Sequence, residues 1–168
     1  GQLVPFPLES FGIVPRTPVG LVGIATAPFL HASLGHLAGN TGALTALLIV
    51  LAATRGESLR VVTAIVLVSG GLIWLLGRPA NHIGASSLVY GLITYLIVSG
   101  VLAWRFLPMV VSLVVALVYG GSLALGILPR WASTISWEGH LFGAAAGVMV
   151  AWWMSRIREA EIGPVTLD

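Results

Sequence analysis

Five long apolar runs, separated by short polar breaks, dominate the chain. Each is close to the ~20 residues that a helix needs to cross the hydrocarbon core of a bilayer. The breaks are rich in arginine, glycine, serine and proline, which are residues typical of loops between spans. We therefore predict five membrane-spanning helices, over residues 34–53, 61–76, 86–105, 109–128 and 139–154.

The segment before these runs has a different pattern. Residues 1–28 hold five of the nine prolines of the chain, and a proline inside a helix removes a backbone hydrogen bond. Irregular backbone is tolerated at membrane depth only when it packs against protein. We expect these residues to form a loop that lies along or dips into the membrane interface.

Composition extends this picture to the whole chain. Of 168 residues, 57% are hydrophobic and 8% are charged, whereas soluble domains carry about 25% charged residues. We predict an all-α, polytopic membrane helix bundle that forms one domain over residues 1–168. Within it we expect an interfacial loop region at 1–30, a five-helix core at 31–154 and a charged cytoplasmic tail at 155–168. A net charge of +2 is too small to indicate nucleic acid, and the absence of cysteine excludes disulfides and thiolate chemistry.

The arginines predict an orientation. Five spans place alternate loops on opposite sides, and cytoplasmic loops are enriched in arginine and lysine. One side carries five of the eight arginines and is expected to be cytoplasmic: Arg55, Arg60, Arg105, Arg156 and Arg158. The other side carries Arg16, Arg78 and Arg130. The polar starts of the first, third and fifth spans then meet on the non-cytoplasmic side.

Candidate chemistry gathers at these three helix starts. Ser86 follows Gly84 and Ala85 and opens the third span, where first-turn N–H groups attract negative charge. It is a candidate nucleophile beside an oxyanion site. The alternative is that the small residues only begin and pack a membrane helix.

Two other helix starts supply hydrogen-bond donors and a base. His36 and Asn40 are one turn apart, so both lie on one face of the first span and can donate hydrogen bonds. His140 is a candidate general base at the start of the fifth span. Gly143 and Gly147 form a G-x-x-x-G step that predicts a close approach by a neighbouring helix. Packing hydrogen bonds are the alternative for each polar residue taken alone.

The ordered set of residues resembles the rhomboid intramembrane serine proteases over roughly residues 12–154. The resemblance rests on His31-x4-His36-x3-Asn40, Gly84-Ala85-Ser86, Tyr90 and Gly139-His140-x2-Gly143-x3-Gly147. The loop from Phe11 to His31 is also similar to the corresponding loop of bacterial members.

The resemblance implies a Ser–His dyad with no carboxylate member. Ser86 would be the nucleophile and His140 its general base, while His36, Asn40 and the backbone N–H of Ser86 would form the oxyanion hole. Tyr90 would pack on the catalytic imidazole, and His31 would have a structural or gating role. Expected substrates are transmembrane proteins in a bacterial plasma membrane, and no cofactor or metal is implied.

Two departures from the family pattern leave an alternative open. The residue after the nucleophile is Ser87, where the family usually has glycine, and an added side chain would narrow the oxyanion pocket. The family core has six spans, so we expect a further span before residue 1. The alternative is a catalytically impaired relative that binds transmembrane clients without cleaving them. The substrate and the oligomeric state are not readable from the sequence.

The remaining histidines, one glutamate and two tryptophans also give predictions. A transporter or metal site built on the four histidines (His31, His36, His82 and His140) is a third alternative, although no HExxH pattern is present. His82 is expected to be an exposed loop histidine, and Glu138 to satisfy first-turn N–H groups of its helix. Trp131 and Trp137 are expected to anchor a polar, aromatic loop, 129–137, at the interface.

Overall fold

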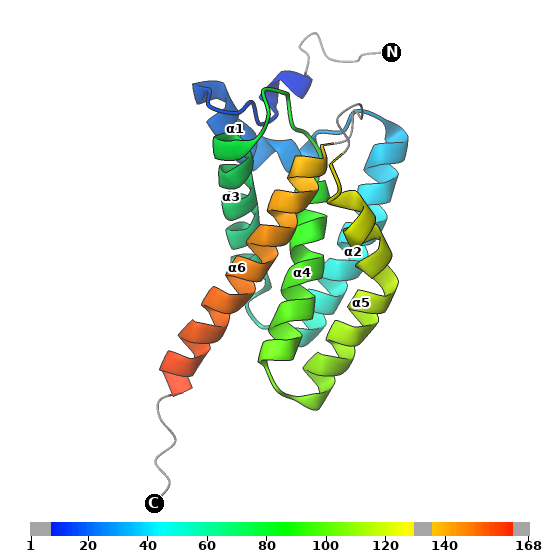
Figure 1. Ribbon diagram of the computed structural model, residues 1–168, viewed down its shortest axis with the longest axis vertical. Helices are drawn as coiled ribbons and strands as arrows, with labels where there is room; N and C mark the ends of the chain where they lie inside the picture. The colour runs from blue at the N-terminus through cyan, green and yellow to red at the C-terminus, as the bar shows by residue number, and fades with distance from the viewer. Residues whose placement is uncertain (1–7, 130–135, 163–168) are drawn as a thin grey trace, which may run out of the picture.

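The protein is a bundle of α-helices with a short helical cap over one end (Figure 1). The structure, a computed structural model, describes residues 8–129 and 136–162. The elements within these ranges are η1 (Leu8–Phe11), α1 (Pro18–Thr26), η2 (Ala27–Phe29), α2 (Leu34–Thr54), α3 (Ser58–Leu76), α4 (Ser86–Leu102), α5 (Phe106–Gly126) and α6 (Trp137–Ile162). Most of the predicted interfacial loop 129–137, including Trp131, lies outside the described residues, and Trp137 begins α6.

Each predicted span coincides with one helix, α2 to α6. Helices α2, α3 and α5 are long and apolar enough to cross a membrane, and α4 is apolar but has only 17 residues. Helix α6 differs most from the prediction, because it continues two turns beyond residue 154 to Ile162. Arginine and glutamate are good helix formers, so the charged residues predicted as a tail extend the helix.

Helix α4 is the centre of the bundle. It contacts α2, α3, α5 and α6, and its residues Leu92, Ile93, Tyr95 and Leu96 are almost completely buried. The outer helices instead turn apolar side chains outward, as Leu117 of α5, 75% exposed, illustrates. Apolar surfaces of this kind are stable against lipid rather than water, so the arrangement is that of a membrane protein.

Glycines bring α6 into backbone contact with α4. A Cβ atom on Gly143 would overlap the backbone of Ser87, and a Cβ atom on Gly147 would overlap the carbonyl of Gly91. The close approach predicted from the G-x-x-x-G step is therefore observed. At these two positions the helix that begins with Ser86 and the helix that carries His140 are too close for a side chain to fit between them.

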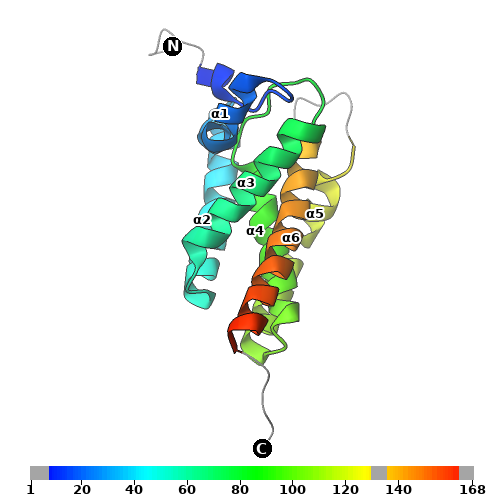
Figure 2. The ribbon, with the colours of Figure 1, turned by 90° about the vertical axis from the view of Figure 1, so that its left-hand side faces the viewer.

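The N-terminal segment, predicted to be a loop, contains the helix α1, because Thr17 caps its start and Pro18 stands at the first helical position, where proline removes no hydrogen bond. The segment docks on the end of α3. Ile13 pairs through its backbone with His82 in the α3–α4 connection, at 2.9 and 3.0 Å. Arg16, in the left-handed region with φ 58°, donates from its guanidinium to the carbonyls of Leu75 and Gly77 at 3.1 and 3.0 Å. These carbonyls lie at the C-terminal end of α3, where no intrahelical donor remains. Figure 2 shows α1 above α2 and beside the upper part of α3.

Candidate active site

Ser86 is the first helical residue of α4, and the chain descends into the bundle before reaching it (Figures 1 and 2). Gly84 makes this entry possible. Its φ of +110° is a conformation that residues with a Cβ rarely adopt, and its N–H donates to the carbonyl of Ala27 at 2.9 Å. The N–H of Ser86 has no intrahelical acceptor because Ala85 is the N-cap.

His36 and Asn40 lie against this turn. A Cβ atom on Gly84 would stand 2.7 Å from Cε1 of His36 and 3.5 Å from Nδ2 of Asn40. Ser33 fixes the start of α2 by accepting a hydrogen bond from the His36 N–H at 3.1 Å. Asn40 is only 8% exposed, and its Nδ2 has no acceptor among the described residues. A buried donor without an acceptor is suited to a ligand oxygen.

His140 is held by the ring of Tyr90 and by a backbone carbonyl. The two rings are stacked, with centroids 4.1 Å apart and an interplanar angle of 3°. Nδ1 of His140 lies 3.1 Å from the carbonyl oxygen of Gly126, and Tyr90 donates its hydroxyl to the carbonyl of Ser122 at 2.9 Å. A carbonyl only accepts, so the proton of a neutral imidazole is on Nδ1 and Nε2 carries the lone pair of a base.

These groups share one cavity of about 600 Å³ between α2, α4, α5 and α6. Its polar lining consists of Ser33, His36, Asn40, Asn81, Ser86, Tyr90, Tyr119, Ser122, Ser136 and His140. Ser87 is not part of this lining; it lines a small neighbouring pocket, and its backbone contacts Gly143 of α6. The residue that departs from the family pattern therefore does not narrow the cavity that contains His36 and Asn40.

His31 contacts His36 but does not line this cavity. The two rings meet edge to face with centroids 5.1 Å apart. Both ring nitrogens of His31 are buried and have no partner among the described residues. This contact places His31 where it limits the orientation of the His36 ring.

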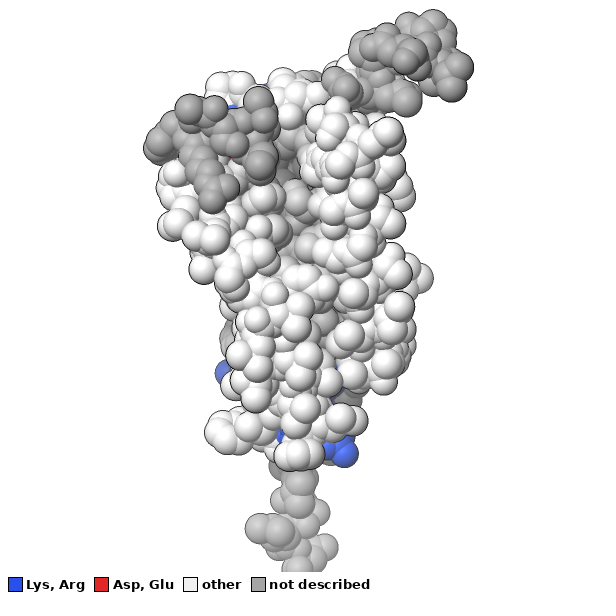
Figure 3. All heavy atoms as spheres, turned by 90° about the vertical axis from the view of Figure 1, so that its right-hand side faces the viewer, with Lys and Arg blue, Asp and Glu red and all other residues white. Residues whose placement is uncertain are grey.

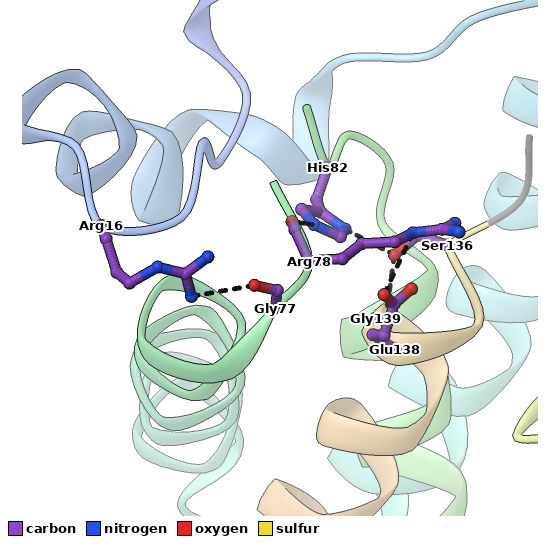
Figure 4. A network of polar contacts seen from close by, with 7 residues as sticks. All are labelled: Arg16, Gly77, Arg78, His82, Ser136, Glu138 and Gly139. Carbon is purple, nitrogen blue, oxygen red and sulfur yellow. Dashed lines mark hydrogen bonds and ion pairs between the residues drawn. The ribbon is translucent and has the colours of Figure 1, made fainter. Parts of the chain in front are cut away.

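A polar network that the sequence did not predict fixes the start of α6 (Figure 4). His82 was predicted to be exposed, and this prediction is wrong: it is 4% exposed, with Nδ1 2.6 Å from the Ser136 hydroxyl and Nε2 3.2 Å from the Arg78 carbonyl. Pairing of its backbone with Ile13 draws it under the N-terminal segment. Burial lowers the pKa of His82 below its ordinary value.

The same network corrects the expectation for Glu138. Its Oε1 pairs with Nε of Arg78 at 3.1 Å, and the carboxylate is buried. The first-turn N–H of Gly139 is capped instead by the hydroxyl of Ser136 at 3.1 Å. Ser136 is three residues before Gly139, which is the spacing of an N-cap serine, so the sequence did contain a signal for it. The network connects the α3–α4 connection to the helix that carries His140.

The histidines occupy separate environments. His31 and His36 contact each other, whereas His82 lies in the Arg78 network and His140 against Tyr90 and Gly126. Over residues 8–129 and 136–162, no group of three or more histidine, aspartate or glutamate side chains is placed to hold a metal ion.

Comparisons with known proteins identify the family of the chain. The model of the Rhomboid domain matches residues 19–157. An uncharacterized protein of Mycobacterium tuberculosis and one of Mycobacterium bovis are each 40% identical over 157 residues, which is 88% of this chain and 65% of the relative. An uncharacterized protein of Mycobacterium leprae is 37% identical over 164 residues, with 92% and 64% covered. No solved structure matches the chain significantly.

The family model covers most of a chain that folds as a helical bundle. The chain belongs to the rhomboid family, and it is a membrane protein. It spans just under two thirds of the length of the curated mycobacterial relatives that it matches.

Proposed function

We propose that the chain is an intramembrane serine endopeptidase that cleaves transmembrane protein substrates in or near their membrane-spanning segments. The observation that carries this proposal is the environment of His140. An imidazole stacked on Tyr90, with Nδ1 on the Gly126 carbonyl, is oriented as a base without a carboxylate, and it lines the same cavity as Ser86.

The proposed reaction uses groups at three helix starts. Nε2 of His140 takes the proton of the Ser86 hydroxyl while Oγ of Ser86 attacks the scissile carbonyl carbon. Donors from His36, Asn40 and the Ser86 N–H stabilise the resulting oxyanion. The C–N bond then breaks, the amine leaves with the proton from His140, and water hydrolyses the acyl-enzyme by the same steps. In this proposal the cavity opens to the non-cytoplasmic side of a bacterial plasma membrane.

Activity-based labelling tests the dyad. The full chain in detergent should react with a fluorophosphonate probe, and Ser86→Ala and His140→Ala should each abolish labelling and cleavage of a transmembrane substrate. Ser155→Ala is a matched control, because Ser155 lies on α6 far from His140 and its hydroxyl donates to the Trp152 carbonyl of the same helix at 2.7 Å. Cleavage retained by Ser86→Ala would refute the dyad. A folded wild-type chain that binds transmembrane segments without labelling would support the non-cleaving alternative.

A further inference from the structure

A second polar cavity, of about 320 Å³, lies at the end of the bundle opposite to Ser86. It is formed where α2, α4 and α6 approach that end and where α5 begins. Its polar lining includes Thr54, Arg55, Tyr95, Ser99, Arg105 and Arg158. Figure 3 shows a face that is almost entirely uncharged, with blue basic atoms gathered at this end.

The three arginines that line this cavity have no carboxylate partner among the described residues. The ion pairs within those residues involve other arginines. Glu159 also lines the cavity, but its Oε2 pairs with Arg156 at 3.4 Å. The cavity therefore concentrates positive charge from Arg55, Arg105 and Arg158.

The interior of the cavity also offers hydrogen-bond donors that the protein leaves unused. Arg55 donates from Nη2 to the Ser99 hydroxyl at 3.2 Å, but its Nε is buried without an acceptor. The hydroxyl of Tyr95, on a side chain that is completely buried, has no partner in the described part of the chain. Burial lowers the pKa of Arg55, and the nearby charge of Arg158 contributes to this lowering. A ligand with several anionic acceptor oxygens would satisfy all of these groups.

We propose that this cavity binds the phosphate group of an anionic membrane phospholipid. A guanidinium group can donate two parallel hydrogen bonds to two oxygens of one phosphate, and the Tyr95 hydroxyl would donate to a third oxygen. The cavity lies at the ends of apolar, outward-facing helices, which is the level of lipid headgroups. The site is independent of Ser86 and of cleavage.

Binding to lipids of defined charge tests the proposal. The full chain is titrated with phosphatidylglycerol, phosphatidylcholine or inorganic phosphate, and bound ligand is counted by native mass spectrometry. Phosphatidylglycerol should bind more tightly than the other two. Arg55→Gln, Arg158→Gln and Arg105→Gln should each weaken phosphatidylglycerol binding about fivefold. Tyr95→Phe should also weaken this binding, because it removes the hydroxyl and keeps the ring.

Arg60→Gln is the matched control, because Arg60 lies at the same end but is exposed and paired with Glu57 at 3.8 Å. It should leave the affinity within about twofold. Equal losses in Arg60→Gln and Arg55→Gln, or equal binding of phosphatidylcholine, would overturn the site. Inorganic phosphate binding as tightly as phosphatidylglycerol would overturn the lipid as the source. Arg105 is exposed in the α4–α5 connection, so its variant tests the site even if Arg55→Gln does not fold.

Discussion

At the residue scale, the ring of Tyr90 is the feature that gives the imidazole of His140 a single orientation. The stack at 4.1 Å restricts rotation of the histidine, and the carbonyl of Gly126 selects its tautomer. In serine hydrolases with a triad, a carboxylate provides both functions. In the proposed dyad, the aromatic face of Tyr90 would restrict rotation of the imidazole and the carbonyl of Gly126 would select its tautomer.

Tyr90→Ala should therefore lower activity much more than Tyr90→Phe. Phenylalanine keeps the stacked ring and loses only the hydrogen bond to the Ser122 carbonyl. Alanine frees the imidazole, and misplacement of a catalytic group by about 1 Å costs on the order of 10²-fold in rate. Steady-state cleavage of a transmembrane substrate measures the difference. Equal activities in the two variants would show that the ring does not position His140.

A second residue-scale prediction concerns Gly84. Gly84→Ala places a methyl group 2.7 Å from His36 and forces a residue with a Cβ to a φ of +110°. We expect a loss of about 1–3 kcal/mol in the free energy of unfolding, together with reduced probe labelling at Ser86. Gly71→Ala is the control, since a Cβ atom there meets nothing within 4 Å. Denaturant unfolding in detergent compares the two, and equal stabilities would contradict the strain at Gly84.

At the element scale, the contact between α4 and α6 sets the distance between Ser86 and His140, the proposed nucleophile and base. Ser86 begins one helix and His140 lies in the first turn of the other, so any separation of the helices displaces both groups. Gly143 and Gly147 allow the contact because their missing Cβ atoms leave room for the backbone of α4.

Gly147→Ala should weaken this contact without touching either proposed catalytic residue. The added methyl group overlaps the carbonyl of Gly91 and the hydroxyl of Thr94, and overpacking of this kind typically costs about 1–3 kcal/mol. Gly120→Ala in α5, where a Cβ atom meets nothing within 4 Å, should be close to neutral. Unfolding midpoints and cleavage rates of the two variants are the measurements. A stable, fully active Gly147→Ala would contradict the role of close packing.

At the scale of the whole molecule, we expect His82 to couple stability to pH through the network at the start of α6. Burial lowers the pKa of folded His82, and Arg78 and Glu138 are the charged groups of this network. The unfolded chain binds the proton near pH 6.5, whereas the folded chain binds it only at lower pH. Stability should therefore be complete above that value and should fall as pH decreases from about 6.5 to the folded pKa.

Thermal unfolding of the full chain between pH 8 and pH 5 measures this dependence. His82→Gln should be less stable than the wild type at pH 8 and should lose less stability on acidification. His31→Gln is the control, because it makes the same substitution outside the network of Arg78 and Glu138. Parallel curves for the wild type and His82→Gln would show that another group causes the acid sensitivity.

The sequence alone determined the helices α2 to α6, their order and the candidate residues Ser86, His36, Asn40 and His140, but not the short helix α1 within the segment predicted to be a loop. Runs of apolar residues determine membrane helices because backbone groups in lipid must be satisfied within each segment. The starts of three alternate helices must meet on one side, so Ser86, His36, Asn40 and His140 could be grouped without coordinates. The predicted end of the last helix was wrong, since α6 continues through Arg156 and Arg158, where a tail was predicted.

Only the tertiary structure decided how these residues are held. The stack of Tyr90 on His140, the contact of His36 with Gly84 and the burial of His82 all depend on distances between separate helices or loops. Spacing along one helix cannot specify these distances, because they result from packing of the whole bundle. For the same reason Ser87, which differs from the family pattern, could not be assigned from the sequence. In the structure the backbone of Ser87 lies against Gly143 of α6, and Ser87 does not line the cavity that contains Ser86.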